Sequence, residues 1–166
     1  CLNCTHALNL AIQGIVQPND HVIISNLEHN AVLRPVAAMV RERGVQCSIA
    51  PVSVDDKETI AAFRARIRPN TRAMICTLAS NVTGQILPYR ELAALCNEHD
   101  ICMIADGAQA CGTLPVQMSD GINILCTAGH KGLYGATGTG LLITDTKFPI
   151  KPLLYLSLIH ISEPTR

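Results

Sequence analysis

The alternation of short apolar runs with longer amphipathic segments constrains this fold more than any other feature of the sequence. Short apolar runs predict buried strands, and apolar residues at helical spacing predict helices. Strands are expected at residues 21–25, 45–50, 73–77, 101–105, 124–126 and 140–143, and helices at 30–43, 57–67 and 89–99. The first segment, CTHALNLAIQGI, also has helical spacing. Repeated strand, helix, strand units require a mostly parallel sheet with helices on both faces, so we predict an α/β fold.

Charge and aromatic content exclude two classes of function. The 13 Lys and Arg residues balance the 13 Asp and Glu residues, and the chain has three Tyr, two Phe and no Trp. A nucleic-acid clamp needs excess positive charge, and a single-strand binder needs aromatic rings for stacking. No stretch reaches the roughly 18 to 20 apolar residues of a membrane span, and no signal peptide opens the chain. We therefore expect a cytoplasmic protein that binds neither nucleic acid nor a membrane.

The eight cysteines are interpreted as reduced core residues. Their density is below that of disulfide scaffolds, and most lie in apolar runs, such as Cys76 in AMICTL and Cys102 in ICMIA. Cys1 and Cys4 form one C-x-x-C pair, but no second pair follows at zinc-ribbon spacing. We expect no metal site.

The two ends of the chain differ from the rest. The chain opens at Cys1 without a Met, so we expect the beginning of the protein to be missing. Regular α/β patterning stops near Lys147, and residues 156–166 resemble a translated vector-derived ending. We expect that tail to be non-native; a C-terminal strand cut short is the alternative.

Polar residues that directly follow the strands are the candidates for function, because ligands of parallel sheets bind beyond the carboxyl ends of the strands. Asp106 ends a nearly continuous apolar strand, where a carboxylate is costly unless it meets a cation or several donors. It could cap a helix at residues 108–111, or it could share a ligand with Gln109.

Three other strand-end or helix-start residues have two interpretations each. Asn81 could fix the turn NVTG or contact a ligand. His29 could be an interior histidine or a flat ring over a ligand's aromatic face. Thr5 could simply cap the first helix, or it could join the free backbone N–H groups there in an anion site.

The segment GHKGLYGATGTG, residues 129–140, holds five of the eleven glycines, which lets the backbone approach another group closely. It matches neither nucleotide-loop motif in its spacing. Lys131 within it could be a solvated surface lysine or a site residue.

Five segments in order carry a family resemblance: CTHALN, EHNAVLRP, ASNVTGQILP, ADGAQACGTLPV and GHKGLYGATGTG. Together they resemble the class V aminotransferase family of pyridoxal-phosphate (PLP) enzymes, most closely its cysteine desulfurase-like members. The resemblance covers residues 4–143. It implies a fold-type I PLP-binding large domain over residues 1–150, incomplete because its N-terminus and the C-terminal small domain are missing.

The resemblance also implies roles for single residues. Lys131 would bind the cofactor aldehyde as a Schiff base, and Asp106 would pair with the protonated pyridine nitrogen. His29 would stack on the ring, so Lys131 and His29 are the expected catalytic residues. The remaining cofactor contacts are expected from Asn81 and Gln109 near the ring oxygen, and from Thr5, the backbone of Cys4 to His6, and His130 at the phosphate.

Two positions depart from the family pattern. Ala136 stands where a proline is common in the glycine-rich loop, which would loosen that loop. Ala128 stands where a phosphate-binding hydroxyl is usual, so that hydrogen bond would be lost or supplied by Thr127.

The function implied for the full-length protein is sulfur transfer from L-cysteine, which leaves L-alanine and an enzyme persulfide. A sulfur-acceptor protein and a homodimer are also implied. The catalytic cysteine and the substrate-binding arginines would lie outside this chain, although Cys4, at a helix start, could have a lowered pKa. We therefore expect residues 1–166 alone to bind cofactor at best and to have no turnover. Alternatives within the family are a selenocysteine lyase, a class V aminotransferase or an epimerase; outside it, a non-covalent nucleotide-binding module or a non-catalytic scaffold.

Overall fold

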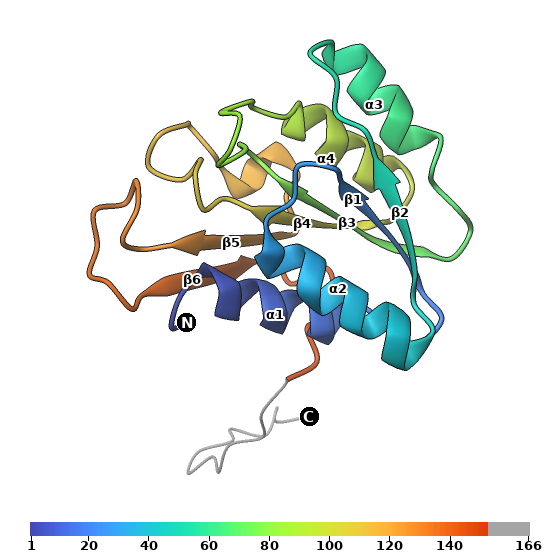
Figure 1. Cartoon of the computed structure of the whole chain (residues 1–166), viewed down its shortest axis with the longest axis horizontal. Helices are drawn as coiled ribbons and strands as arrows, with labels where there is room; N and C mark the ends of the chain where they lie inside the picture. The colour runs from blue at the N-terminus through green and yellow to red at the C-terminus, as the bar shows by residue number, and fades with distance from the viewer. Residues whose placement is uncertain (153–166) are drawn as a thin grey trace, which may run out of the picture.

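The expected strands form one sheet in the computed structural model, which describes residues 1–152 (Figure 1). They are β1 His21–Ser25, β2 Gln46–Ala50, β3 Thr71–Thr77, β4 Cys102–Asp106, β5 Ile124–Ala128 and β6 Gly140–Thr144. Their order is β2-β1-β3-β4-β5-β6, and only β6 runs antiparallel to its neighbour. The prediction of a mostly parallel sheet is confirmed. The expected non-native tail lies outside the described residues.

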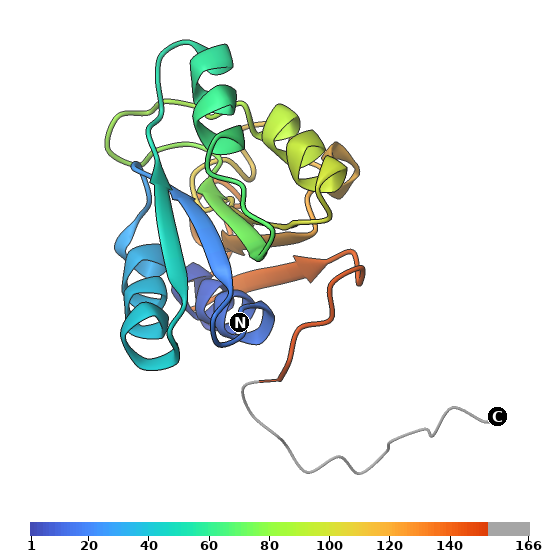
Figure 2. The same cartoon turned by 90° about the vertical axis from the view of Figure 1, so that its right-hand side faces the viewer.

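Helices cover both faces of the sheet, as predicted (Figures 1 and 2). α1 Cys4–Ile15 and α2 Asn30–Arg43 pack on one face, and α3 Asp56–Arg64 and α4 Tyr89–Glu98 pack on the other. A short 3₁₀ helix spans Met118–Asp120. In the part of the chain that the structure describes, no helix has both the length and the apolar character to cross a bilayer.

The helix expected at residues 57–67 ends three residues early, at Arg64. The N–H groups of Arg66 and Ile67 bond to carbonyls only three residues back, which tightens the chain into a final turn. The strand–helix pattern was therefore right, and one helix end was wrong.

Alternation of side chains along the strands divides the core into two clusters. Ile75 and Cys102 pack against α1 and α2, whereas Met74 and Cys76 pack against α3 and α4. Six of the eight cysteines are buried, which confirms their prediction as core residues. The prediction is wrong for Cys1, which is exposed, and Cys47 is half-buried.

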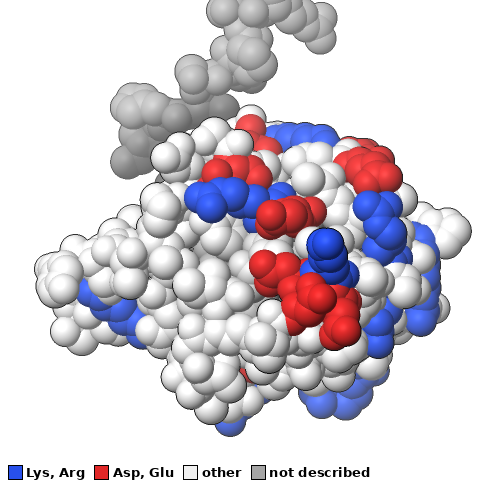
Figure 3. Space-filling model, turned by 90° about the horizontal axis from the view of Figure 1, so that it is seen from above, with Lys and Arg blue, Asp and Glu red and all other residues white. Residues whose placement is uncertain are grey.

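The face formed by α3 and α4 carries charges of both signs. Arg64 on α3 pairs with Glu98 on α4 at 3.1 Å, and Arg90 on α4 pairs with Asp120 at 3.0 Å. Figure 3 shows basic and acidic side chains next to one another on this face. Acidic and basic side chains, which balance over the whole chain, are thus also neighbours on this face.

A buried histidine stands at the opposite end of the sheet from the carboxyl ends of the strands. His21, the first residue of β1, is 0% exposed, and its two ring nitrogens contact the hydroxyls of Thr71 (2.8 Å) and Ser48 (2.9 Å). Burial, with a smaller contribution from Arg68, lowers the pKa of His21 to about 4. The folded protein therefore holds this ring neutral at pH values where the unfolded chain protonates it.

Because the unfolded state binds the extra proton, the free energy of unfolding should fall as the pH drops from about 6.5 to about 4. We expect a loss of roughly 2 kcal/mol between pH 7 and pH 5 from this residue alone. Urea denaturation at the two pH values measures it, with His21→Gln compared against His99→Gln at a more exposed site. An equal pH dependence in wild type and His21→Gln would contradict the prediction.

Candidate functional site

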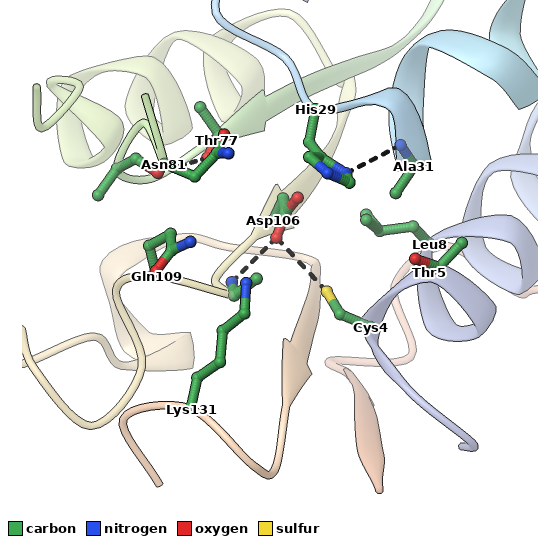
Figure 4. Close-up of a pocket in the computed structure, with 12 residues that line it drawn as sticks. Cys4, Thr5, Leu8, His29, Ala31, Thr77, Asn81, Asp106, Gln109 and Lys131 are labelled. Atoms are coloured by element: carbon green, nitrogen blue, oxygen red, sulfur yellow. Dashed lines mark hydrogen bonds between the residues drawn. The ribbon is translucent and has the colours of Figure 1, made fainter. Parts of the chain in front are cut away.

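The candidate site lies where the connections of the sheet diverge. β1 leads through α2 to β2 on one side, while β3 and β4 follow on the other side. A cavity of about 90 Å³ opens at the carboxyl ends of these strands, where a topological switch point favours ligand binding (Figure 4). Of the nine residues singled out from the sequence, seven line it: Cys4, Thr5, His29, Asn81, Asp106, Gln109 and Lys131. His6 and His130 are not among its lining residues.

Asp106 forms the floor of this cavity at the end of β4. The residue is 4% exposed. Its Oδ1 atom accepts the N–H of Ala108 at 2.9 Å and the thiol of Cys4 at 3.4 Å (Figure 4). Within residues 1–152 both hydrogen bonds of the Asp106 carboxylate go to Oδ1, so Oδ2 stays available to a group in the cavity.

The helix expected at residues 108–111 is wrong. The chain makes a single turn there, because the N–H groups of Ala110 and Cys111 both bond to the carbonyl of Gly107. Asp106 therefore caps a turn rather than a helix.

Cys4 is buried at the start of α1 with its thiol directed at Asp106 (Figure 4). Burial raises the pKa of this thiol far above its usual value, and the negative charge of Asp106 raises it further. The expectation of a lowered pKa at a helix start is wrong, because loss of solvation outweighs the attraction of Lys131 and the helix terminus. Cys4 acts here as a hydrogen-bond donor.

Lys131 enters the cavity from the loop that follows β5 (Figure 4). A Cβ atom on the next residue, Gly132, would clash with the backbone of Cys111, and Gly112 has a left-handed φ of +85°. Glycine at these positions lets the loop after β5 pack directly on the loop after β4. That contact places Lys131 on the same side of the sheet as Asp106, although its side chain is exposed like that of a surface lysine.

His29 precedes α2 as its N-cap residue and is exposed, so the interpretation as an interior histidine is wrong. Its Nδ1 atom accepts the N–H of Ala31 at 3.1 Å. When the ring is neutral, its proton therefore resides on Nε2. This hydrogen bond fixes the ring at the edge of the cavity (Figure 4).

Two amide side chains stand at the rim of the cavity. Asn81 was a candidate for holding the turn after β3, but Ser80 does this instead: its Oγ accepts the N–H groups of Val82 (3.3 Å) and Thr83 (3.2 Å). Asn81 and Gln109 lie on the same side of the cavity in Figure 4. Both are exposed and are positioned to contact a bound molecule.

The start of α1 contributes a hydroxyl and backbone N–H groups. Asn3, not Thr5, caps this helix: its side chain accepts the N–H of His6 at 2.8 Å. The expectation that Thr5 could serve as the N-cap is wrong, because the cap lies two residues earlier, at Asn3, and the helix begins at Cys4. The Thr5 side chain is thereby left to line the cavity.

Thr127 does not compensate for the alanine at position 128. Its hydroxyl is buried and donates to the carbonyl of Gly107 at 3.2 Å. Thr127 is not among the lining residues of the cavity, so it does not replace the ligand-binding hydroxyl that Ala128 lacks.

Sequence reasoning missed Glu28, a buried carboxyl group between β1 and β3. It is 8% exposed, and Oε1 accepts the hydroxyl of Ser25 at 2.5 Å and the N–H of Thr77 at 2.8 Å. In residues 1–152, Oε2 is the one buried side-chain polar atom without a hydrogen-bond partner. Burial raises the pKa of Glu28 to about 7. A glutamate in the polar run SNLEHN is typical of an exposed loop, so the sequence carried no sign of this burial.

Comparisons with known proteins agree on one family. The family model for aminotransferase class-V matches residues 1–159. A mitochondrial cysteine desulfurase of Arabidopsis thaliana is 30% identical over 143 residues, covering 83% of this chain and 31% of the relative. A cysteine desulfurase of Yersinia pestis is 31% identical over 143 residues, covering 83% of this chain and 35% of the relative. The chain thus spans about a third of the length of these relatives.

Solved structures give the same result. The cysteine desulfurase CsdA from Escherichia coli superposes with a TM-score of 0.79 at 26% identity, over 87% of this chain and 37% of that protein. A lysine-to-alanine mutant of C-DES, with glycine covalently linked to the PLP cofactor, superposes with a TM-score of 0.83 at 26% identity, over 90% and 42%. C-DES, a cystine C-S lyase, has also been solved with its product cysteine persulfide (TM-score 0.80, 27% identity, 87% and 40%).

Proposed function

Because the chain belongs to the aminotransferase class-V family, whose cysteine desulfurases depend on PLP, we propose that it forms the cofactor-binding part of a cysteine desulfurase. Residues 1–150 would be the PLP-binding large domain of that enzyme. The observation that carries the proposal is the convergence of Lys131, Asp106 and His29 on one cavity at the carboxyl edge of the sheet.

The donor set of the cavity fits PLP. The amine of Lys131 suits an aldehyde, and the open Oδ2 of Asp106 suits a protonated ring nitrogen. The imidazole of His29 offers a flat surface for an aromatic ring. These groups come from three different connections of the sheet, so a single small heterocycle accounts for all of them.

The phosphate would be held at the start of α1. The hydroxyl of Thr5 lines the cavity there, and the positive end of a 12-residue helix favours an anion. The N–H of His6 is already used by Asn3, so Cys4 and Thr5 supply the backbone donors of this turn. His130 remains a predicted phosphate contact from the loop beside Lys131.

When bound, the cofactor supplies an electron-withdrawing ring for the substrate's α-carbon. Asp106 would keep the ring nitrogen protonated, and Lys131 would provide the covalent attachment and hold a proton beside the reacting carbon. Asn81 and Gln109 would orient the ring from its edge. In the complete enzyme the C–S bond of L-cysteine would break as an S–S bond forms with an enzyme thiol, and the proton of that thiol would end on the carbon that loses sulfur, which leaves L-alanine and an enzyme persulfide.

A homodimer, a cytoplasmic location and a sulfur-acceptor protein follow from this assignment and stay predictions. A selenocysteine lyase, another class V aminotransferase and an epimerase are the alternatives within the family.

The full-length protein with PLP and a reductant should release sulfide and alanine in equal amounts from L-cysteine. Parallel assays with L-selenocysteine, L-cystine and L-alanine plus a 2-oxo acid separate desulfuration from selenide release, cystine cleavage and transamination. Activity on one of the other substrates alone would reassign the reaction within the family. A protein that never acquires a visible PLP band would overturn the proposal.

A further inference from the structure

We propose that Glu28 is a positioning residue of this site, which holds His29 at the cofactor pocket by tying the end of β1 to the end of β3. The proposal rests on the proposed function, because it concerns how tightly the pocket binds PLP. It is carried by the hydrogen bonds of the Glu28 carboxyl group and by its place in the chain.

The Glu28 carboxyl group replaces a backbone hydrogen bond that is missing between β1 and β3. In a parallel strand, successive backbone N–H groups point to opposite neighbours. The N–H of Leu78 bonds to Asp106 on the β4 side, so that of Thr77 points toward β1. The paired register of β1 and β3 stops at Ile24 and Ile75, because the chain then leaves the sheet toward α2. The carboxyl group of Glu28 comes back to accept the Thr77 N–H at 2.8 Å.

The same carboxyl group fastens the turn in front of His29. Oε1 also accepts the hydroxyl of Ser25 at 2.5 Å, and the Ser25 oxygen in turn accepts the N–H of Leu27 at 3.1 Å. The turn is thus closed on itself and bound to β3. His29 is the next residue along the chain, and its ring is held from the other side by Ala31. Without the Glu28 anchor, the Ala31 contact would still hold the ring and the His29 carbonyl would still accept the N–H groups of Val32 and Leu33, but the turn before His29 would lose its bond to β3.

A neutral side chain of the same shape should perform this task. The Glu28 carboxyl group accepts hydrogen bonds from Ser25 on β1 and Thr77 on β3. The other titratable groups that interact with its charge are Asp106 on β4 and Cys76 on β3. None of these groups is a cation. Anchoring therefore needs two accepted hydrogen bonds rather than a negative charge. A glutamine amide oxygen can accept both, and its NH2 group would take the buried place of Oε2, which also has no partner in residues 1–152.

The test titrates the full-length apoprotein with PLP and follows the visible band to obtain a dissociation constant. We expect Glu28→Gln to bind within about threefold of wild type, and Glu28→Ala to bind about 10-fold more weakly or worse, because the Thr77 and Ser25 donors lose their partner. Glu28→Asp keeps the acid but is one methylene too short to reach both donors, so it should lie between them. If the alanine variant fails to fold, Glu28→Asp replaces it in the comparison with wild type.

A double-mutant cycle distinguishes positioning from general destabilisation. If Glu28 acts through His29, adding Glu28→Ala to His29→Ala should weaken PLP binding by less than about threefold further. Glu42→Ala, at an exposed position of α2, is the control for loss of a carboxylate. Equal effects in both backgrounds, or a lower melting temperature with unchanged PLP affinity, would overturn the inference. Absence of PLP binding by wild type would overturn the proposed function and this inference together, whereas binding that Glu28→Ala leaves intact would overturn this inference alone.

Discussion

The Lys131→Ala variant of the full-length protein should lose the visible absorbance of attached PLP and at least roughly 1,000-fold of its activity on L-cysteine. Lys131 is the amine that lines the cavity together with Asp106, and alanine supplies neither the covalent attachment nor a group that can carry a proton. Borohydride should fix PLP to the wild-type protein and add its mass to the peptide containing Lys131. The variant should gain no such mass.

Two further substitutions make this result specific. Lys131→Arg keeps the positive charge but not an amine, so it should be as inactive as the alanine variant if attachment is what matters. Lys57→Ala, at an exposed position of α3, is the matched control and should retain wild-type absorbance and activity. A Lys131→Arg protein with substantial turnover would show that Lys131 contributes charge alone, and the proposed role would be withdrawn.

The sheet and its helices could be predicted because their causes are local. Buried parallel strands are continuous apolar runs, and the helices that cover them have one apolar stripe. Both patterns can therefore be recognised in a single sequence. The ends of elements were less predictable. The start of α1 depended on whether Asn3 or Thr5 supplies the cap, and both residue types favour that position. The turn after Asp106 depended on two N–H groups sharing the carbonyl of Gly107, which no residue pattern specifies.

The candidate site was predictable where a residue breaks the local pattern. Asp106 is conspicuous because a carboxylate follows an apolar strand, and Lys131 because it lies among glycines. Glu28 breaks no pattern, since it stands three residues beyond Ser25 in a polar segment. Its burial arises only when the chain leaves β1 and the side chain turns back to Thr77, 49 residues further along the sequence. Contacts of this kind depend on the topology of the sheet, which a sequence pattern does not describe.

Asp106→Asn should reduce turnover on L-cysteine by roughly 100-fold or more while leaving the fold intact. An asparagine oxygen can still accept the N–H of Ala108 and the thiol of Cys4, so both hydrogen bonds of Oδ1 persist. What is lost is the negative charge beside the cavity that would hold a proton on the ring nitrogen of PLP. We therefore expect the loss mainly in kcat, with the melting temperature of the apoprotein within a few degrees of wild type.

The absorption spectrum provides a second measurement that does not depend on turnover. PLP should still attach to Lys131 in the Asp106→Asn protein, because the amine is unchanged, but its visible band should shift once the ring nitrogen is no longer paired with a carboxylate. Asp56→Asn on the exposed surface of α3 removes the same charge far from any contact with the cavity and should change neither spectrum nor kcat. If Asp106→Asn matches wild type in both, its carboxylate serves only to cap the turn at Ala108, and the cofactor would have to find its ring partner elsewhere.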